Sequence, residues 1–420
     1  MSTQTKISLA IISTTAILFF FLTINKPVST EMNWTQEELA ILRSLRLPSK
    51  WEVSDPSNKY FHNAQAAMLG QQLFIDTQLS RSKQIACASC HQPEHYFTLT
   101  HNSDISISKQ VPSLLGVASF NWFMLDGSAD SLWAQALKPL ENHIEHGGTR
   151  TQYAQHIIKQ YPLLYQDTFG LIPTQLVNTL LPEQASPNSQ HLAEQEQWQQ
   201  LDTYTQNAIN RVFANIGKSL AAYQATLWPQ DTRFDRYIDQ LSASTKKSAN
   251  IQVPLLNANE IAGLRIFISE QGQCLRCHNG PLLSNGDFHA TTVPTPLPNA
   301  QLGRWQGIEV ALADPFNCLG RYSDSHSAQC RELIYSKRAT AELIGATKVP
   351  SLRNISATAP YMHAGQFSTI KDVLHYYNRA AAPFGAHSDL TPLKLLPYQL
   401  NQLEAFLLTL TSDVSNEPTK

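Results

Sequence analysis

Two short motifs in this chain combine the residue types that attach a haem covalently. Each motif has the pattern C-x-x-C-H, in which two thiols add to the vinyl groups of a haem and the histidine becomes an axial ligand of the iron. Four of the six cysteines fall in these motifs. The motifs therefore predict two covalently bound c-type haems. Their residues are Cys87, Cys90 and His91 in the first copy and Cys274, Cys277 and His278 in the second.

Paired cysteines also occur in zinc sites and in thioredoxin-like redox sites. A zinc site built from two C-x-x-C pairs would leave the histidine after each pair unexplained. A thioredoxin-like site would need a βαβ pattern, and the sequence around neither motif has one. The haem interpretation accounts for all three residue types in their order. The remaining pair, Cys318 and Cys330, is interpreted as a structural disulfide, with two free thiols as the alternative.

An apolar segment near the N-terminus indicates export. Lys6 precedes an apolar run from Ile7 to about Ile24, which is typical of a signal sequence or an uncleaved membrane anchor. The run is close to the minimum length for spanning a bilayer, and the absence of a small-residue cleavage site after it favours the anchor. We expect residues 1–30 to be one or the other. The rest of the chain is then periplasmic, with a possible single-pass tether to the inner membrane.

The composition limits the class of protein and of partner. The formal net charge is −2, and long runs of one sign are absent from the sequence. A nucleic-acid partner would need a basic face, so we expect none. The roughly 390 residues that follow the apolar segment are enough for two ordinary domains.

Helical periodicity dominates this remainder, and strand-like alternation is scarce. An apolar helix leads into each motif through a short loop, as at the start of a small cytochrome c domain. We predict an all-α fold of two cytochrome c-like helical domains, each with one covalently attached haem. The predicted domains are 31–240, with the first haem, and 257–420, with the second, joined by a linker at 241–256. One predicted helix follows a capping box at residues 35–38. The other predicted helices cover residues 64–75, 204–227, 257–268 and 397–410.

Longer stretches carry a family resemblance that extends from about Leu69 to Leu410. The most specific are residues 69–75, 126–140, 314–318, 349–354 and 358–367, the last containing Pro-Tyr-Met-His-Ala-Gly. They resemble the bacterial di-haem cytochrome c peroxidase superfamily, most of all its MauG-type and methanobactin-associated oxidases. The resemblance implies that hydrogen peroxide is activated at the haem on His91. It also implies that the haem on His278 relays electrons.

The resemblance further suggests the sixth ligand of the second haem. Tyr377 stands where ordinary peroxidases of the superfamily have a methionine and where MauG-type enzymes have a tyrosine. A phenolate ligand stabilises oxidised iron and lowers its potential, which favours storing oxidising equivalents. Met362 is the rival ligand, and a tyrosine on an apolar helix face is more often part of a core.

On the peroxide side, the family places a glutamate that moves the peroxide proton, and Glu145 holds that position here, with Gln135 as its polar companion. Glu141 and His146 are neighbours that could be confused with it. Ordinary peroxidases also need a displaceable histidine after the first motif. Only His95 and His101 are candidates and neither is well placed, so we expect a five-coordinate first haem.

Three positions depart from the family pattern. Leu125 replaces a tryptophan that carries electrons between the haems, for which Trp122 or Trp133 could substitute, and Ser128 replaces an arginine. Gln110 replaces an asparagine that helps to bind calcium, and this longer side chain puts the ion in doubt. The calcium ligands implied by the resemblance are Gln110 and the carbonyl groups of Thr358 and Pro360.

Three functions follow from these residues. The first is peroxide-dependent, MauG-like oxidation of a periplasmic protein partner, favoured by Tyr377. The second is an ordinary cytochrome c peroxidase that takes electrons from a small redox protein. The third is an electron-transfer cytochrome without catalysis, favoured by Leu125 and Ser128 but opposed by Glu145.

Overall fold

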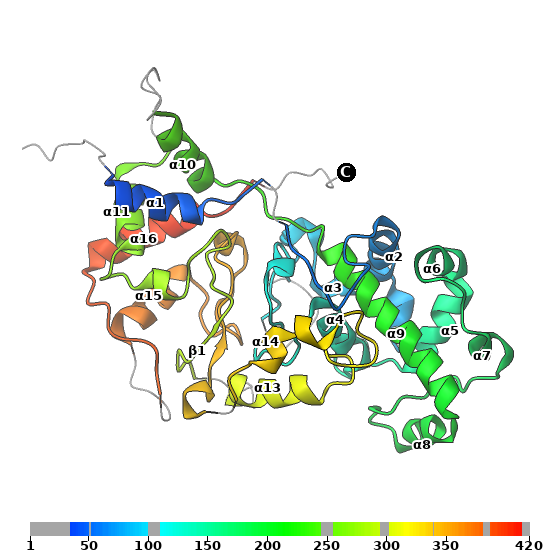
Figure 1. Cartoon of the computed structure of the whole chain (residues 1–420). Coiled ribbons are helices and arrows are strands. Elements are labelled where there is room, and N and C mark those ends of the chain that lie inside the picture. Colours follow the sequence, from blue (N-terminus) through cyan, green and yellow to red (C-terminus); the bar gives the residue numbers. More distant parts are fainter. Residues whose placement is uncertain are drawn as a thin grey trace, which may run out of the picture. The chain divides into compact units, whose positions relative to one another are not determined.

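The computed structural model describes residues 34–49, 52–99, 110–244, 255–294, 302–338, 340–380 and 387–413. The predicted signal sequence or anchor at residues 1–30 lies outside these ranges. Helices dominate the described residues, as predicted, and strand is limited to one short antiparallel pair (Figure 1). The chain divides into two units, residues 1–41 and 42–420, which are described separately.

The described part of the first unit begins with the predicted capping box. Thr35 N donates to Glu38 Oε2 at 2.8 Å, and Glu38 N donates to Thr35 Oγ1 at 3.1 Å. These two bonds satisfy N–H groups that have no partner within a helix. Helix α1 (Gln36–Leu45) starts there.

Two crossing helices organise the first half of the second unit, residues 42–244. Helix α2 (Ala64–Ile75) has the predicted bounds, and it packs against the long helix α9 (Thr203–Gln224) (Figure 1). A Cβ atom on Gly70 would lie 2.0 Å from the Ser219 carbonyl oxygen, so only glycine permits this approach. The other elements are η1 (Thr77–Leu79), α3 (Cys87–Cys90), η2 (Pro93–His95), η3 (Val117–Ser119), α4 (Leu132–Glu141), α5 (Arg150–Gln160), α6 (Pro162–Phe169), α7 (Thr174–Asn178), α8 (Leu192–Gln200) and α10 (Arg233–Ser244).

The second half, residues 255–413, repeats this crossing. Helix α11 (Ala258–Ile268) begins at the predicted Asn257 cap and packs against α16 (Pro397–Leu408). A Cβ atom on Gly263 would lie 1.9 Å from the Gln402 carbonyl oxygen. The other elements are η4 (Cys274–Arg276), β1 (Phe288–His289), α13 (Arg304–Ala313), η5 (Ser327–Gln329), α14 (Arg331–Ile334), η6 (Ala341–Leu343), β2 (Thr347–Lys348), η7 (Ile355–Ala357) and α15 (Ile370–Arg379).

The predicted linker at residues 241–256 begins later than expected, because α10 continues to Ser244. Residues 245–254 lie outside the described ranges. The division into two haem domains stays a prediction.

A four-residue sequence occurs once in each half, next to a backbone hydrogen bond to the other half. Gln110 and Lys348 each precede the same four residues, Val-Pro-Ser-Leu. The N–H of Gln110 donates to the His363 carbonyl at 3.2 Å, and the N–H of Lys348 donates to the Leu125 carbonyl at 2.9 Å. Each half therefore offers the other a backbone bond from an equivalent position.

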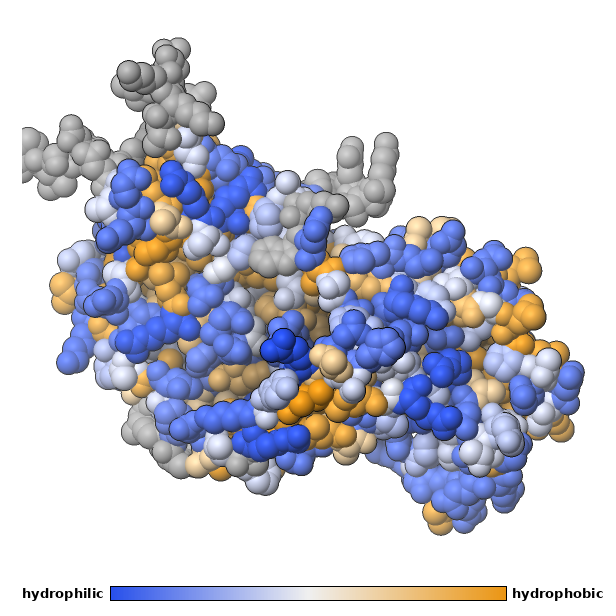
Figure 2. All heavy atoms as spheres, viewed as in Figure 1, coloured by the Kyte–Doolittle hydropathy of each residue, from blue (hydrophilic) through white to orange (hydrophobic). Residues whose placement is uncertain are grey.

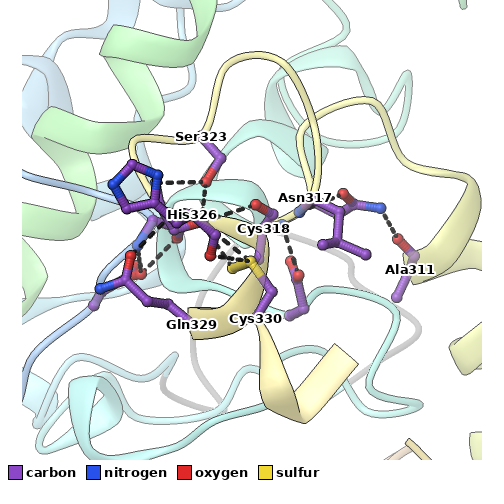
Figure 3. The surroundings of a disulfide bond; sticks show 12 residues. Ala311, Asn317, Cys318, Ser323, His326, Gln329 and Cys330 are labelled. Carbon is purple, nitrogen blue, oxygen red and sulfur yellow. Dashed lines mark hydrogen bonds between the residues drawn. A yellow bond between two sulfur atoms is a disulfide. The ribbon is translucent and has the colours of Figure 1, made fainter. Parts of the chain in front are cut away.

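Residues 314–330 form an arm that packs on the first half and contains a disulfide between Cys318 and Cys330 (Figure 3). Cys318 and Cys330 are bonded to each other, which confirms the predicted disulfide. Phe316 and Tyr322 are buried in the hydrophobic core of the first half. The backbone N–H of Cys318 donates to Asp130 Oδ2 at 2.8 Å. The arm thus fixes a segment of the second half against the first.

The face in Figure 2 is mainly hydrophilic, with apolar residues scattered over it. Exposed apolar side chains are ordinary on a protein surface. Within the described ranges, helices are all too short or too polar to cross a membrane.

Candidate haem sites

The first motif forms a single helical turn, α3, with His91 at its C-terminal end. The N–H of His91 donates to the Cys87 carbonyl at 2.9 Å, which closes the turn. The Nδ1 atom of His91 lies 3.0 Å from the Phe97 carbonyl oxygen and can only donate to it. The other ring nitrogen, Nε2, is then left without a proton and free to bind iron. Burial lowers the pKa of His91, which favours the same neutral form.

The second motif repeats this arrangement. Cys274 and its neighbours form η4, and the N–H of His278 donates to the Cys274 carbonyl at 2.7 Å. The Nδ1 atom of His278 lies 2.9 Å from the Leu283 carbonyl oxygen. Burial lowers the pKa of His278 to about 4. Both imidazoles are therefore held neutral, with Nε2 available as a ligand.

The thiols of both motifs are free and partly buried, and burial raises the pKa of each. Two thiols on a short turn that ends in an imidazole with an available Nε2 atom fit a covalently attached haem. They do not fit a zinc site of the C-x-x-C type, since the described residues hold no cluster of His, Cys, Asp and Glu that could bind a metal ion.

Tyr377 lies on α15, beside the second motif. Burial raises the pKa of its phenol, and the Cys277 thiol, Tyr376 and the Cys274 thiol raise it further. The phenol is therefore near enough to both thiols for their charge to affect its ionisation. The adjacent ring of Tyr376 is committed elsewhere, because its hydroxyl donates to the Thr291 carbonyl at 2.8 Å.

The two glutamates that follow Gln135 along and beyond α4 have different surroundings. Arg150 donates to Glu141 through Nε at 3.0 Å and Nη2 at 2.9 Å, so the Glu141 carboxylate belongs to a structural ion pair. Glu145 instead raises the pKa of the Cys87 and Cys90 thiols, after the larger effect of burial. The Glu145 carboxylate therefore lies near the first motif. Gln135 is half-buried on α4.

His146 also contacts the first motif, which the sequence did not reveal. Its Nε2 atom lies 4.0 Å from Cys87 Sγ, and its Nδ1 atom is buried without a hydrogen-bond partner in the described part of the chain. Burial lowers the pKa of His146 to about 4, and His91 lowers it further. His95, by contrast, is exposed in η2, and His101 lies outside the described residues.

The tryptophans near Leu125 have other contacts. Trp133 is fully buried and donates from Nε1 to Ser57 Oγ at 2.8 Å, so it is part of the core. Trp122 lies under the guanidinium of Arg304, whose Cζ atom is 3.7 Å from the ring centroid. A cation at this distance disfavours positive charge on the ring. Ser128 is buried, and its N–H donates to Asp126 Oδ1 at 3.0 Å.

The expected calcium ligands do not fit a cation. Gln110 directs an amide donor, Nε2, at the Thr358 carbonyl oxygen over 3.0 Å. A calcium ion needs oxygen atoms facing it, and this N–H group occupies the carbonyl that the resemblance assigns to the ion. Pro360 follows Thr358 by two positions, after a cis peptide bond. The structure gives calcium no support.

Comparison with known proteins agrees with the paired C-x-x-C-H sites. A family model described as di-haem cytochrome c peroxidase matches residues 64–243. The cytochrome-c peroxidase IdrP2 of Denitromonas iodatirespirans is 27% identical, over 84% of this chain and 83% of the relative. The methylamine utilization protein MauG of Methylophilus methylotrophus is 24% identical, over 82% of each chain.

Solved structures share the fold. A MauG-like protein associated with microbial copper homeostasis has a TM-score of 0.57 at 21% identity, covering 91% of this chain and 96% of that one. The di-haem peroxidase BthA of Burkholderia thailandensis has a TM-score of 0.58 at 18% identity, covering 87% and 94%.

The helical fold and the two C-x-x-C-H loops define the class of di-haem c-type oxidoreductases. Within that class, residues 64–243 match the family model described as di-haem cytochrome c peroxidase, and most of the chain is similar to proteins named cytochrome-c peroxidase and MauG.

Proposed function

We propose that this chain is a periplasmic di-haem enzyme that uses hydrogen peroxide to oxidise a protein partner, as MauG-type enzymes do. Peroxide reacts at the His91 site, and electrons from the partner pass through the site of His278 and Tyr377. The proposal combines the similarity to the family with the surroundings of these three residues and of Glu145.

One observation carries the choice of a MauG-like activity. The phenol of Tyr377, on α15, is buried, and the Cys277 and Cys274 thiols are near enough to raise its pKa. A phenolate ligand stabilises the oxidised state of iron more than a thioether does. A site of this kind is suited to holding oxidising equivalents until a partner supplies electrons.

The remaining residues have roles that follow from their contacts. When bound, the haems supply the redox chemistry of peroxide reduction. The Phe97 and Leu283 carbonyls hold the His91 and His278 rings in one tautomer. Glu145 is the acid and base that moves the peroxide proton, because its carboxylate lies near the first motif while that of Glu141 is bound by Arg150.

A second function is favoured by the relatives. The chain is 27% identical to a protein named cytochrome-c peroxidase, which suggests an ordinary peroxidase fed by a small redox protein. The two functions differ in the state of the enzyme that reacts with peroxide.

The test is to add hydrogen peroxide to the fully oxidised protein in a stopped-flow spectrometer. A MauG-like enzyme gives an immediate and long-lived change in the haem spectrum. A spectrum that changes only after one haem has been reduced would support the ordinary peroxidase instead. Electron paramagnetic resonance of the oxidised protein should show one high-spin and one low-spin haem, and two low-spin haems would contradict an open His91 site.

A further inference from the structure

The ammonium group of Lys348 stacks on an aromatic ring and does not pair with an anion of the described residues. Its Nζ atom lies 3.4 Å from the centroid of the Phe120 ring. No carboxylate or hydrogen-bond acceptor of the described residues contacts this nitrogen. Burial lowers the pKa of Lys348 to about 7, which reflects the cost of an unbalanced charge.

The backbone around Lys348 is tied to the loop that orients His278. Ser284 donates from Oγ to the Val349 carbonyl at 2.8 Å, and the Val349 N–H donates to the Asp287 carbonyl at 2.9 Å. Ser284 directly follows Leu283, whose carbonyl holds the His278 ring. Lys348 also pairs with Phe288 in the β1–β2 ladder.

Phe120, under the ammonium group, is close to the same loop. A Cβ atom on Gly286 would lie 2.9 Å from Phe120 Cδ1. Lys348 and Phe120 therefore lie next to the loop that orients His278, where the two halves meet through the bond from Lys348 N to Leu125 O.

The equivalent position in the other half shows how such a side chain is normally satisfied. Gln110 precedes the same Val-Pro-Ser-Leu sequence, and its amide donates to a carbonyl, that of Thr358. Lys348 lacks such an acceptor among the described residues. The Lys348 side chain is only partly buried, so an anion that arrives with a ligand can reach the ammonium group and balance its charge.

A haem carries two propionate carboxylates, which are anions of the right kind. We propose that Lys348 is a propionate-binding residue for the haem attached at Cys274 and Cys277. The inference rests on the proposed attachment of that haem. The positive charge of Lys348 then stabilises the reduced state of this haem and raises the reduction potential of the haem.

The test compares variants of the full-length, haem-loaded protein by spectroelectrochemistry. K348Q should lower the potential of the second haem and leave the first unchanged. A tenfold change in the reduction equilibrium corresponds to about 59 mV for one electron, and we expect a shift of about this size. K348R keeps the charge and should restore most of the potential. K159Q, which removes an exposed lysine of α5, is the matched control and should have no effect.

Two further measurements separate the possible failures. Resonance Raman spectra should show a shifted propionate bending band in K348Q, because the substitution removes the group that contacts the propionate. Unchanged potentials in K348Q, with both haems present by mass spectrometry, would overturn the role of Lys348 alone, as would a shift confined to the first haem. A Cys274–Cys277 peptide without haem mass would overturn the proposed function together with it.

Discussion

The side-chain amide of Gln110 donates a hydrogen bond of 3.0 Å to the carbonyl oxygen of Thr358. This contact joins the two halves at the point where the family resemblance implies a calcium ion. A direct hydrogen bond satisfies the carbonyl without a cation.

Calcium should therefore be dispensable. Treatment with a chelator is expected to leave the thermal unfolding midpoint and the haem spectra unchanged, and added calcium should not raise the midpoint. Gln110→Ala should lower stability by about 1 kcal/mol, the usual contribution of one hydrogen bond. A midpoint that rises with calcium concentration would show a bound ion, since a ligand of the folded state stabilises it by mass action.

Tyr377 is expected to be the sixth ligand of the second haem. Tyr377→Phe removes the only atom of this side chain that can bind iron, so the second haem should become high-spin in electron paramagnetic resonance. Tyr376→Phe is the matched control, because that hydroxyl donates to Thr291 instead and its loss should cost about 1 kcal/mol of stability without a change of spin. A low-spin signal that survives in Tyr377→Phe would point to another ligand, and Met362→Leu would then be the next variant to examine.

Glu145 and Glu141 should respond differently to the same substitution. Glu145→Gln removes the proposed proton carrier and should slow the reaction with peroxide by about 10²-fold or more. Glu141→Gln weakens the ion pair with Arg150 and should lower the unfolding midpoint while the peroxide rate stays close to that of the wild type. Stopped-flow kinetics and thermal unfolding of both variants test this. The assignment fails if Glu145→Gln reacts at the wild-type rate.

The sequence predicted the features that depend on local patterns. The bounds of α2 follow from its apolar spacing and from the loop before the first motif, and α11 begins at Asn257 because a capping box is encoded in four consecutive residues. The C-x-x-C-H motifs and the disulfide of Cys318 and Cys330 depend on rare residue types, which few other arrangements explain.

Long-range contacts could not be predicted in this way. Glu141 and Glu145 are four residues apart, and the sequence does not distinguish their roles. Only the folded structure shows that Arg150 binds the Glu141 carboxylate, whereas the Glu145 carboxylate affects the pKa of the Cys87 thiol. His146 against Cys87, and Lys348 over Phe120, likewise bring together residues far apart in sequence. The repeated Val-Pro-Ser-Leu sequence was a usable signal for Lys348, because it marks Gln110 and Lys348 as equivalent positions.

The arm makes stability depend on pH through Asp130. This carboxyl accepts the N–H of Cys318 at 2.8 Å, while burial, with smaller effects from Asp314 and Asp55, raises its pKa to about 6 from an ordinary value of 3.8. The folded protein therefore binds a proton at Asp130 more tightly than the unfolded chain does. The stability that comes from this proton is complete below about pH 4 and is lost as the pH rises through about 6.

Asp130→Asn should remove this dependence. Between pH 4 and pH 7 the wild type should lose about 2–3 kcal/mol more than the variant, because one pKa unit corresponds to about 1.4 kcal/mol. Thermal unfolding midpoints at pH 4.5, 5.5 and 7, with Asp167→Asn on the exposed face of α6 as the control, measure the difference. Parallel profiles for Asp130→Asn and the wild type would mean that Asp130 has the same pKa in the folded and the unfolded protein, which would overturn this prediction.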